Sequence, residues 1–262
     1  MKPLNVSLVS LGSLKYPINI DFIEKWASEI LAVKHRATVN HLPDSEGQFW
    51  EYSGRQLRSL VQADNDADFT VALINAPLED NYYMRRLDDD VVVISLYEMA
   101  DIVQSSNFTI EHYILRNIYE LAVLYVGNNE RIPPSGYTWA HDDVRGCLFD
   151  MNSTKSDIVF SMHRPRLCDA CRHRLSSVQI DSQFLPTLDK ELRRIEKTLY
   201  FRMIEWVKAK PKCALALTAV SAVILNLVAS LIFEWGLGRL PASKTATEAR
   251  ENAKREGVAP SH

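Results

Sequence analysis

The sequence predicts an α/β (α+β) domain, a mixed sheet with flanking helices, followed by an amphipathic helix and one membrane-spanning helix. Over residues 1–180, short runs of β-branched and apolar residues alternate with longer runs of helical periodicity. Residues 187–212 carry apolar residues at steps of three and four among many charges. A run of 21 residues without charge then begins at Cys213. The tail, residues 239–262, is small and polar, and we expect it to be flexible.

The composition restricts the class of protein. The chain has 262 residues, 47% of them hydrophobic, and a formal net charge of −3, so no basic excess points to nucleic acid as a partner. Four cysteines are too few for a disulfide scaffold. The N-terminal residues alternate between apolar and polar and lack a signal-peptide cleavage pattern. We therefore expect a domain in the cytoplasm with reduced thiols.

The first elements follow from hydrophobic periodicity. Residues 5–11, NVSLVSL, alternate as a strand does, whereas residues 19–36 space their apolar residues as a helix does. A short strand is predicted at residues 37–43 and a helix at residues 53–64. The sheet is thus expected to begin with a strand–helix–strand unit.

The middle of the domain is more apolar. Residues 67–78, ADFTVALINAPL, and residues 88–100, DDDVVVISLYEMA, contain continuous apolar runs that predict buried strands. Residues 108–127 place their apolar residues on or near one face and end at Gly127, which predicts a long helix.

The pair Cys168-x-x-Cys171 permits several interpretations. A thioredoxin-type dithiol has this spacing, and so does half of a zinc site. The dithiol usually lies near the start of its domain, but here the pair comes late. Plain buried thiols are a third possibility, and zinc is the interpretation that we favour.

A zinc site needs two further ligands. Cys147 is the remaining cysteine before the apolar run, and His141 lies six residues upstream of it. His163 and His173 are alternatives to His141. One histidine and three thiolates suit tetrahedral zinc, and four protein ligands leave no open coordination position. The sequence therefore predicts a structural zinc and no catalytic residue in this cluster.

The same cysteine segments carry a family resemblance. Cys147-Leu-Phe-Asp followed by Leu-Cys168-Asp-Ala-Cys171 resembles the C-terminal part of archaemetzincin-type metalloprotease domains. Two strands before the long helix follow the order found in that family, and the resemblance covers residues 65–175. It implies a metzincin-like α/β fold whose cysteine-rich tail binds a second, structural zinc.

The catalytic motif of that family is missing. Its catalytic helix carries His-Glu-x-x-His, in which two imidazoles one turn apart bind zinc and the glutamate is the general base. The matching portion here reads RNIYELAVLY, in which Glu120 has no histidine at one-turn spacing. The helix offers only His112, near its start. The resemblance thus implies a protease-like domain that has lost catalysis, a pseudoenzyme.

The apolar segment, residues 213–236, is long enough to cross a bilayer once. Trp206 and Trp235 lie near its two ends, as is typical of membrane interfaces. Four basic residues lie within fifteen positions before it and three after it, which weakly favours an N-terminal domain in the cytoplasm. We expect a single-pass membrane protein.

Small and polar residues recur every four positions along this segment and form one stripe. The stripe consists of Thr218, Ala222, Asn226 and Ser230, and continues to Glu234. Small residues allow helices to approach closely, and Asn226 can form a hydrogen bond across an interface in the bilayer. The stripe predicts self-association or a partner helix.

Together these features predict a binding, sensing or scaffold module tied to a membrane, with an unknown protein or small-molecule ligand. An association-prone helix below such a domain would suit a membrane effector. The rival hypothesis is a membrane-tethered zinc-dependent hydrolase, a peptidase, with an unrecognised active site. A zinc content of one ion per chain would favour the binding module, and two would favour the peptidase.

Overall fold

The computed structural model describes residues 2–135, 139–141, 146–152 and 154–237. The chain divides into two compact units, residues 1–201 and residues 202–262. Each unit is described by itself.

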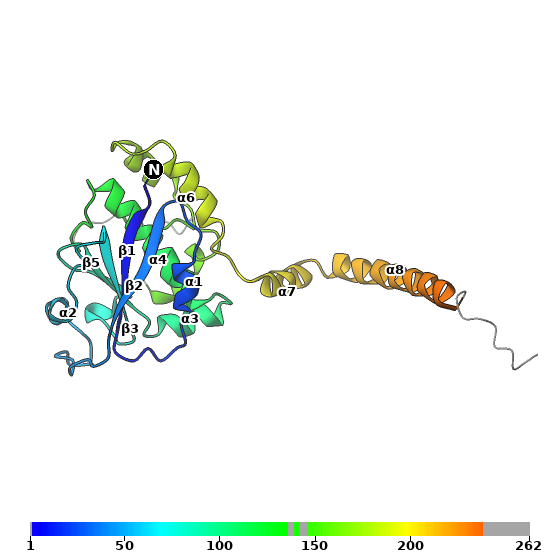
Figure 1. Ribbon diagram of the computed structural model, residues 1–262, viewed down its shortest axis with the longest axis horizontal. Coiled ribbons are helices and arrows are strands. Elements are labelled where there is room, and N and C mark those ends of the chain that lie inside the picture. Colours follow the sequence, from blue (N-terminus) through cyan, green and yellow to red (C-terminus); the bar gives the residue numbers. More distant parts are fainter. Residues whose placement is uncertain (1, 136–138, 142–145, 153, 238–262) are drawn as a thin grey trace, which may run out of the picture. The chain divides into compact units, whose positions relative to one another are not determined.

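The first unit contains a five-stranded mixed sheet (Figure 1). Its strands are β1 (Leu4–Leu11), β2 (Leu31–Val39), β3 (Phe69–Ile74), β4 (Met84–Arg86) and β5 (Val91–Ser95), in the spatial order β2-β1-β3-β5-β4. All pairs are parallel except β4 with β5. The mixed sheet predicted from the sequence is confirmed, and β4 forms its antiparallel edge.

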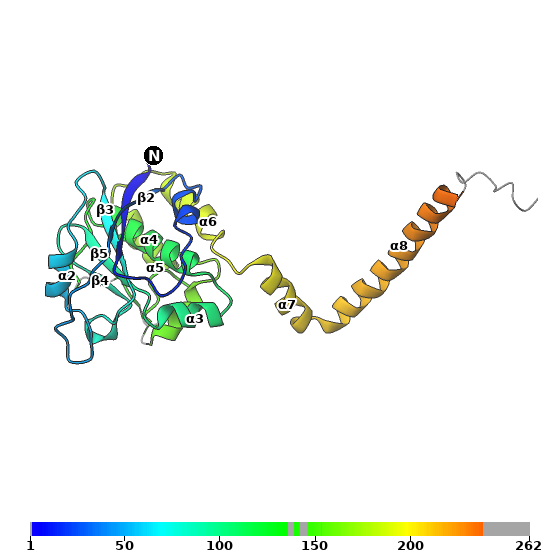
Figure 2. The same ribbon diagram turned by 60° about the horizontal axis from the view of Figure 1, so that its bottom comes forward.

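Helices cover both faces of the sheet (Figure 2). They are α1 (Ile20–Glu24), α2 (Gly54–Leu60), α3 (Met99–Ser105), α4 (Ile110–Gly127), α5 (Asp169–Ser176) and α6 (Phe184–Leu192), with 3₁₀ turns at Glu79–Asn81 and Lys155–Ser161. Val71 and Leu73 of β3 belong to the core that contains α4, whereas Ala72 and Ile74 face α2. This burial on both faces explains the continuous apolar runs.

Helix α4 is the central element of the larger core. The side-chain hydroxyl of Thr109 accepts a hydrogen bond from the backbone N–H of His112 and caps the helix. The His112 ring lies against Phe22 and Trp26, and burial lowers the pKa of this imidazole. His112 is thus part of an aromatic cluster and not of a metal site.

Two elements differ from the sequence expectation. The helix expected over residues 19–36 ends at Glu24, and Leu31 already starts strand β2. Parallel pairing with β1 buries Leu31 and Val33, and this pairing outweighs the local helical periodicity. Strand β4 was not expected, because three residues are too few to show an alternation.

Helix α6 completes the domain. Phe184, Leu188, Leu192 and the following Ile195 are buried in the core. The buried carboxylate of Glu191 accepts hydrogen bonds from the Ser28 hydroxyl (2.6 Å), the Glu29 N–H (2.6 Å) and the Tyr119 hydroxyl (2.7 Å). The region expected as one amphipathic helix, residues 187–212, therefore divides between α6, the separate helix α7 (Leu199–Ala209) and the start of α8.

The second unit contains most of α7 and all of α8 (Pro211–Leu237). Within the described part of the chain, one helical segment, Pro211–Phe233, is long and apolar enough to cross a membrane, with a mean hydropathy of 2.3. This agrees with the span expected at residues 213–236. The predicted flexible tail at residues 239–262 lies outside the described residues, and the cytoplasmic placement of the domain stays a prediction.

The stripe on α8 leads to a test of self-association. Thr218 donates a hydrogen bond to the Ala214 carbonyl (2.9 Å), which satisfies this hydroxyl within its own helix. The exposed Asn226 amide has no such local acceptor among the described contacts. We expect Asn226→Leu to weaken association by about 1 kcal/mol, measured by sedimentation equilibrium in detergent. Leu227→Ile, off the stripe, is the control, and an unchanged oligomer size for Asn226→Leu would contradict the prediction.

Candidate metal centre

A compact loop carries the first two predicted ligands. Gly146 has a φ of +75°, a conformation that glycine adopts without strain, and it directly precedes Cys147. The Leu148 N–H donates to the Arg166 carbonyl (2.9 Å) and the Arg166 N–H to the Gly146 carbonyl (3.0 Å). Pairing of His141 with the segment around Phe149 brings this histidine to the same loop.

The second pair of ligands lies at the start of α5. Cys168 precedes the first residue of the helix, and Cys171 is three residues further, in the first turn. A Cys-x-x-Cys pair at this position directs both sulfurs to one side of the helix end. Backbone pairing between the Cys147 loop and Arg166 places the two halves of the site together.

The structure brings all four predicted ligands into one group. One ligand atom from each of His141, Cys147, Cys168 and Cys171 lies within 4.8 Å of the others. The Cys147 and Cys171 sulfurs are 3.9 Å apart, and His141 Nε2 is 3.3 Å from Cys168 Sγ. A tetrahedral zinc with Zn–S bonds of about 2.3 Å separates two sulfurs by about 3.8 Å. These four residues could therefore hold a zinc ion.

Neither alternative histidine joins the group. His163 lies beside the Phe108 ring, with centroids 6.5 Å apart, and His173 is exposed on α5. His141 is therefore the histidine of the cluster. Among the residues that the structure describes, these four are the only group of three or more His, Cys, Asp or Glu side chains close enough to share an ion.

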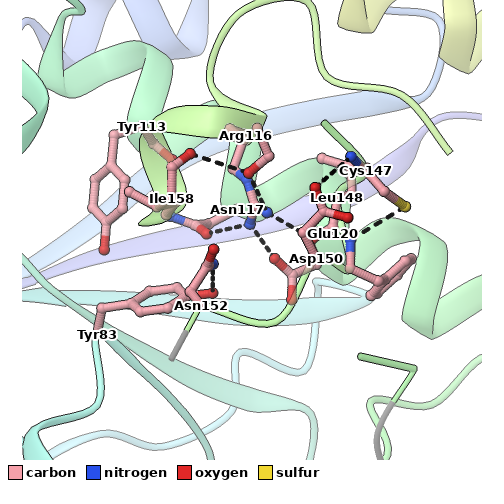
Figure 3. Close-up of polar contacts among 12 residues, drawn as sticks. Tyr83, Tyr113, Arg116, Asn117, Glu120, Cys147, Leu148, Asp150, Asn152 and Ile158 are labelled. Carbon is pink, nitrogen blue, oxygen red and sulfur yellow. Dashed lines mark hydrogen bonds and ion pairs between the residues drawn. The ribbon is translucent and has the colours of Figure 1, made fainter. Parts of the chain in front are cut away.

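Asp150 organises the cluster from one side (Figure 3). Its Oδ2 accepts hydrogen bonds from the N–H groups of Gly146 (2.6 Å) and Cys147 (2.9 Å). Its Oδ1 lies 3.6 Å from His141 Nδ1, on the side of the imidazole away from Cys168. A carboxylate behind a metal-binding histidine fixes the ring orientation and leaves the other nitrogen free for the metal.

The surroundings of Cys147 favour its thiolate. Its sulfur shares a hydrogen bond with the Cys171 sulfur, and the N–H groups of Cys168 (3.4 Å) and Phe149 (3.5 Å) point at it. These donors lower the pKa of Cys147 to about 5. The hydrogen bond with Cys147, together with burial and the charge of the thiolate, raises the pKa of Cys171. Backbone donors aimed at a sulfur are the environment that a zinc-bound thiolate needs.

A buried ion pair connects the cluster to α4 (Figure 3). Arg116 and Glu120, one helical turn apart, form a salt bridge in which the arginine side chain is completely buried. The guanidinium also donates to the Leu148 carbonyl (2.6 Å) and to the Ser161 hydroxyl (3.0 Å). Burial raises the pKa of Glu120, and the charge of Arg116 opposes this rise. The pair holds the Leu148 backbone, next to the ligand Cys147, against α4.

A cavity of about 680 Å³ lies beside this pair. Residues of three segments line it: Tyr82 to Arg86 of the β4 region, Glu120 and Leu124 of α4, and Leu148 to Asn152. Ser135, Trp139 and Ala140 complete the wall. The Asn152 amide donates to the Tyr83 hydroxyl (3.0 Å), whereas its buried Oδ1 has no hydrogen-bond partner among the described residues. The lining combines aromatic surface with polar groups, as is usual for ligand sites.

Comparisons with known proteins return one kind of similar structure. The archaemetzincin from Methanopyrus kandleri matches with 17% identity and a TM-score of 0.46, over 67% of this chain and 94% of that one. The protein from Archaeoglobus fulgidus, solved with malonate, matches with 11% identity and a TM-score of 0.40, over 65% and 99%. Both are archaemetzincins. The archaemetzincin resemblance stated from the cysteine segments names the same family.

No known family model matches the sequence, and no curated protein matches it. At these identities and TM-scores the likeness does not establish an activity for this chain.

Sequence reasoning missed two residues of the site. Asp150 is the last residue of the segment Cys147-Leu-Phe-Asp, but its type alone does not reveal a partner across the loop. Arg116 lies inside an apolar helix, where a charged residue is unusual unless it is paired. Its one-turn spacing to Glu120 was a usable signal for an internal ion pair.

Proposed function

We propose that this chain is a membrane-anchored binding module in which a zinc-stabilised, protease-like domain in the cytoplasm holds an extended peptide segment of a partner protein without cleaving it. The outer edge of β4 at Met84, beside the cavity and unpaired among the described residues, is the observation that carries this proposal. An exposed strand edge can add a peptide as a further strand.

The hydrogen-bond pattern of β4 identifies the free groups. The Tyr83 carbonyl accepts from Ser95 N–H (2.8 Å), and Leu87 N–H donates to the Val91 carbonyl (2.7 Å). Antiparallel pairing alternates, so the N–H and C=O of Met84 and Arg86 point away from β5. The Arg86 carbonyl accepts a hydrogen bond from the Ser135 hydroxyl (2.8 Å). Among the described residues, this leaves the N–H and C=O of Met84 for a peptide.

The walls of the cavity suit an extended segment. Tyr82, Phe149 and Met151 supply apolar surface along it, and Tyr82 and Met151 are exposed. A peptide in extended conformation directs alternate side chains to opposite sides. One set would meet this apolar surface, while the backbone would pair with Met84. Backbone pairing supplies affinity, and the wall residues supply selectivity.

Binding without cleavage is supported by the chemistry of α4. The two side chains at one-turn spacing beside the cavity are Arg116 and Glu120, which neutralise each other. A metallopeptidase needs a metal with an open position to lower the pKa of a bound water. The Cys₃His cluster would give a bound zinc four protein ligands and no open position. A chain of this kind would hold a peptide and leave its amide bonds intact.

Replacement of the edge residue tests the proposal. Met84→Pro removes the outward N–H but no ladder hydrogen bond to β5, and proline is tolerated in edge strands. Loss of one hydrogen bond of about 1 kcal/mol should weaken peptide binding about fivefold. The measurement is fluorescence anisotropy of the full chain in detergent with labelled unstructured peptides from a random library.

The matched control is Met84→Ile, which retains the N–H and most of the side-chain volume. It should bind as the natural chain does. Mass spectrometry of the same samples detects any cleavage of the labelled peptides. Peptide fragments that disappear on zinc chelation would establish the rival hydrolase, and equal binding by both Met84 variants would exclude the β4 edge as the site.

A further inference from the structure

Helix α7 carries an arc of exposed apolar side chains. Its large apolar side chains are exposed: Leu199 (68%), Tyr200 (67%), Met203 (59%), Trp206 (41%) and Val207 (46%). At 100° per residue these positions fall within one arc of the helix. No residue of α7 is buried. A face of this size on a helix of eleven residues indicates an apolar environment that the described residues of the second unit do not supply by themselves.

The charged residues of α7 lie outside this arc, on a side that also carries Phe201. They are Arg202, Glu205 and Lys208, and Lys210 and Lys212 follow directly. The segment from Arg202 to Lys212 thus has one acidic and four basic residues. A basic polar side, an apolar side and a tryptophan are the composition of a helix that lies in a membrane interface.

The sequence position of α7 favours a bilayer over a protein partner. Only Lys210 separates Ala209, its last residue, from Pro211, where the candidate membrane-spanning helix begins. Proline has no N–H and restricts the residue before it, so it starts a new helix instead of extending the previous one. A helix one residue away from a membrane span lies at the surface of that membrane.

We propose that α7 is an interfacial helix that binds a bilayer surface rich in anionic lipid headgroups. Its apolar face enters the boundary between headgroups and acyl chains, and Lys208, Lys210 and Lys212 contact the headgroups. This inference rests on the membrane span of α8 and does not depend on the peptide site at β4.

Site-directed spin labelling of the full chain tests the placement. In a Cys213→Ser background the three remaining cysteines are buried, so a label attached at Met203→Cys or Glu205→Cys reports one position. The probes are vesicles of phosphatidylcholine, with and without phosphatidylserine. We expect the label at position 203 to collide several-fold more often with oxygen than with a water-soluble nickel chelate. The label at position 205, on the charged side, should show the reverse.

Removal of the lysine charges, or of the anionic lipid, is the second part of the experiment. With Lys208, Lys210 and Lys212 all replaced by glutamine, or without phosphatidylserine, the protection at position 203 should fall several-fold. Equal exposure of both labels to the nickel chelate would overturn the proposal, as would protection that is independent of phosphatidylserine. Spin–spin broadening at position 203 would instead show a second copy on this face, and would overturn it too.

Resistance to alkaline extraction, measured on the same vesicles, tests the membrane span of α8 separately from the interfacial placement of α7. A chain that stays in the membrane with a water-exposed label at position 203 contradicts the interfacial helix alone. A chain that is extracted contradicts the membrane span as well.

Discussion

Cys171→Ser is expected to abolish zinc binding and to unfold the segments that carry the four ligands. The binding free energy of a structural zinc is on the order of 10 kcal/mol, comparable with the whole stability of a domain. The backbone pairings that join these segments are short, and Leu148, Phe149 and Leu175 pack in the same core. The loss should therefore spread to α5 and to the neighbouring wall of the cavity.

Metal analysis and amide hydrogen exchange of the purified full chain measure this effect. The natural chain should contain one zinc per chain, and Cys171→Ser should contain none, with faster exchange in α5. Cys213→Ser is the matched control, because Cys213 lies in α8 and outside the cluster. Full protection of α5 in the zinc-free variant would contradict a structural metal. Two zinc ions in the natural chain would point to a catalytic one.

Glu120→Gln is expected to lower the free energy of unfolding by about 3–5 kcal/mol. The Arg116 side chain is completely buried, and the substitution leaves its charge without a counterion. The guanidinium also supports the Leu148 carbonyl, so the damage should reach the zinc loop. Thermal unfolding in detergent, followed by circular dichroism at fixed zinc concentration, gives the difference in stability.

Two controls make this result specific. Glu111→Gln, on the same helix but with a solvent-accessible carboxylate, should cost less than about 1 kcal/mol. The double variant Arg116→Met, Glu120→Leu should cost less than the sum of the two single substitutions, because no charge is left unpaired. A Glu120→Gln protein as stable as the natural chain would show that the pair contributes nothing to stability.

The sequence predicted those elements whose environment is uniform along their length. Strands β3 and β5 are buried on both faces, and α4 is buried almost all round, so their composition indicates both type and position. Strand β2 was misassigned because its identity comes from pairing with β1, more than 25 residues earlier in the chain. Strand β4 depends entirely on its hydrogen bonds to β5.

The candidate site likewise contains residues that the sequence indicated and residues that only the structure showed. Thiolates and imidazole reveal a metal ligand by residue type, so the sequence indicated the zinc cluster without a structure. The role of Asp150 depends on where two N–H groups and one ring nitrogen come to lie, and no spacing rule encodes that. The edge at Met84, with which no described strand pairs, is likewise a property of strand order. This edge can be recognised only from the order of the strands in the folded sheet.

The Glu191 carboxylate also has a consequence for synthesis of the chain. Its partner Ser28 is 163 residues earlier, so the contacts that close the domain wait until α6 has left the ribosome. The apolar helix α8 begins at Pro211, soon after α6 ends at Leu192. With α8 as the proposed membrane span, delivery of the nascent chain to the membrane and closure of the domain would compete for the same interval.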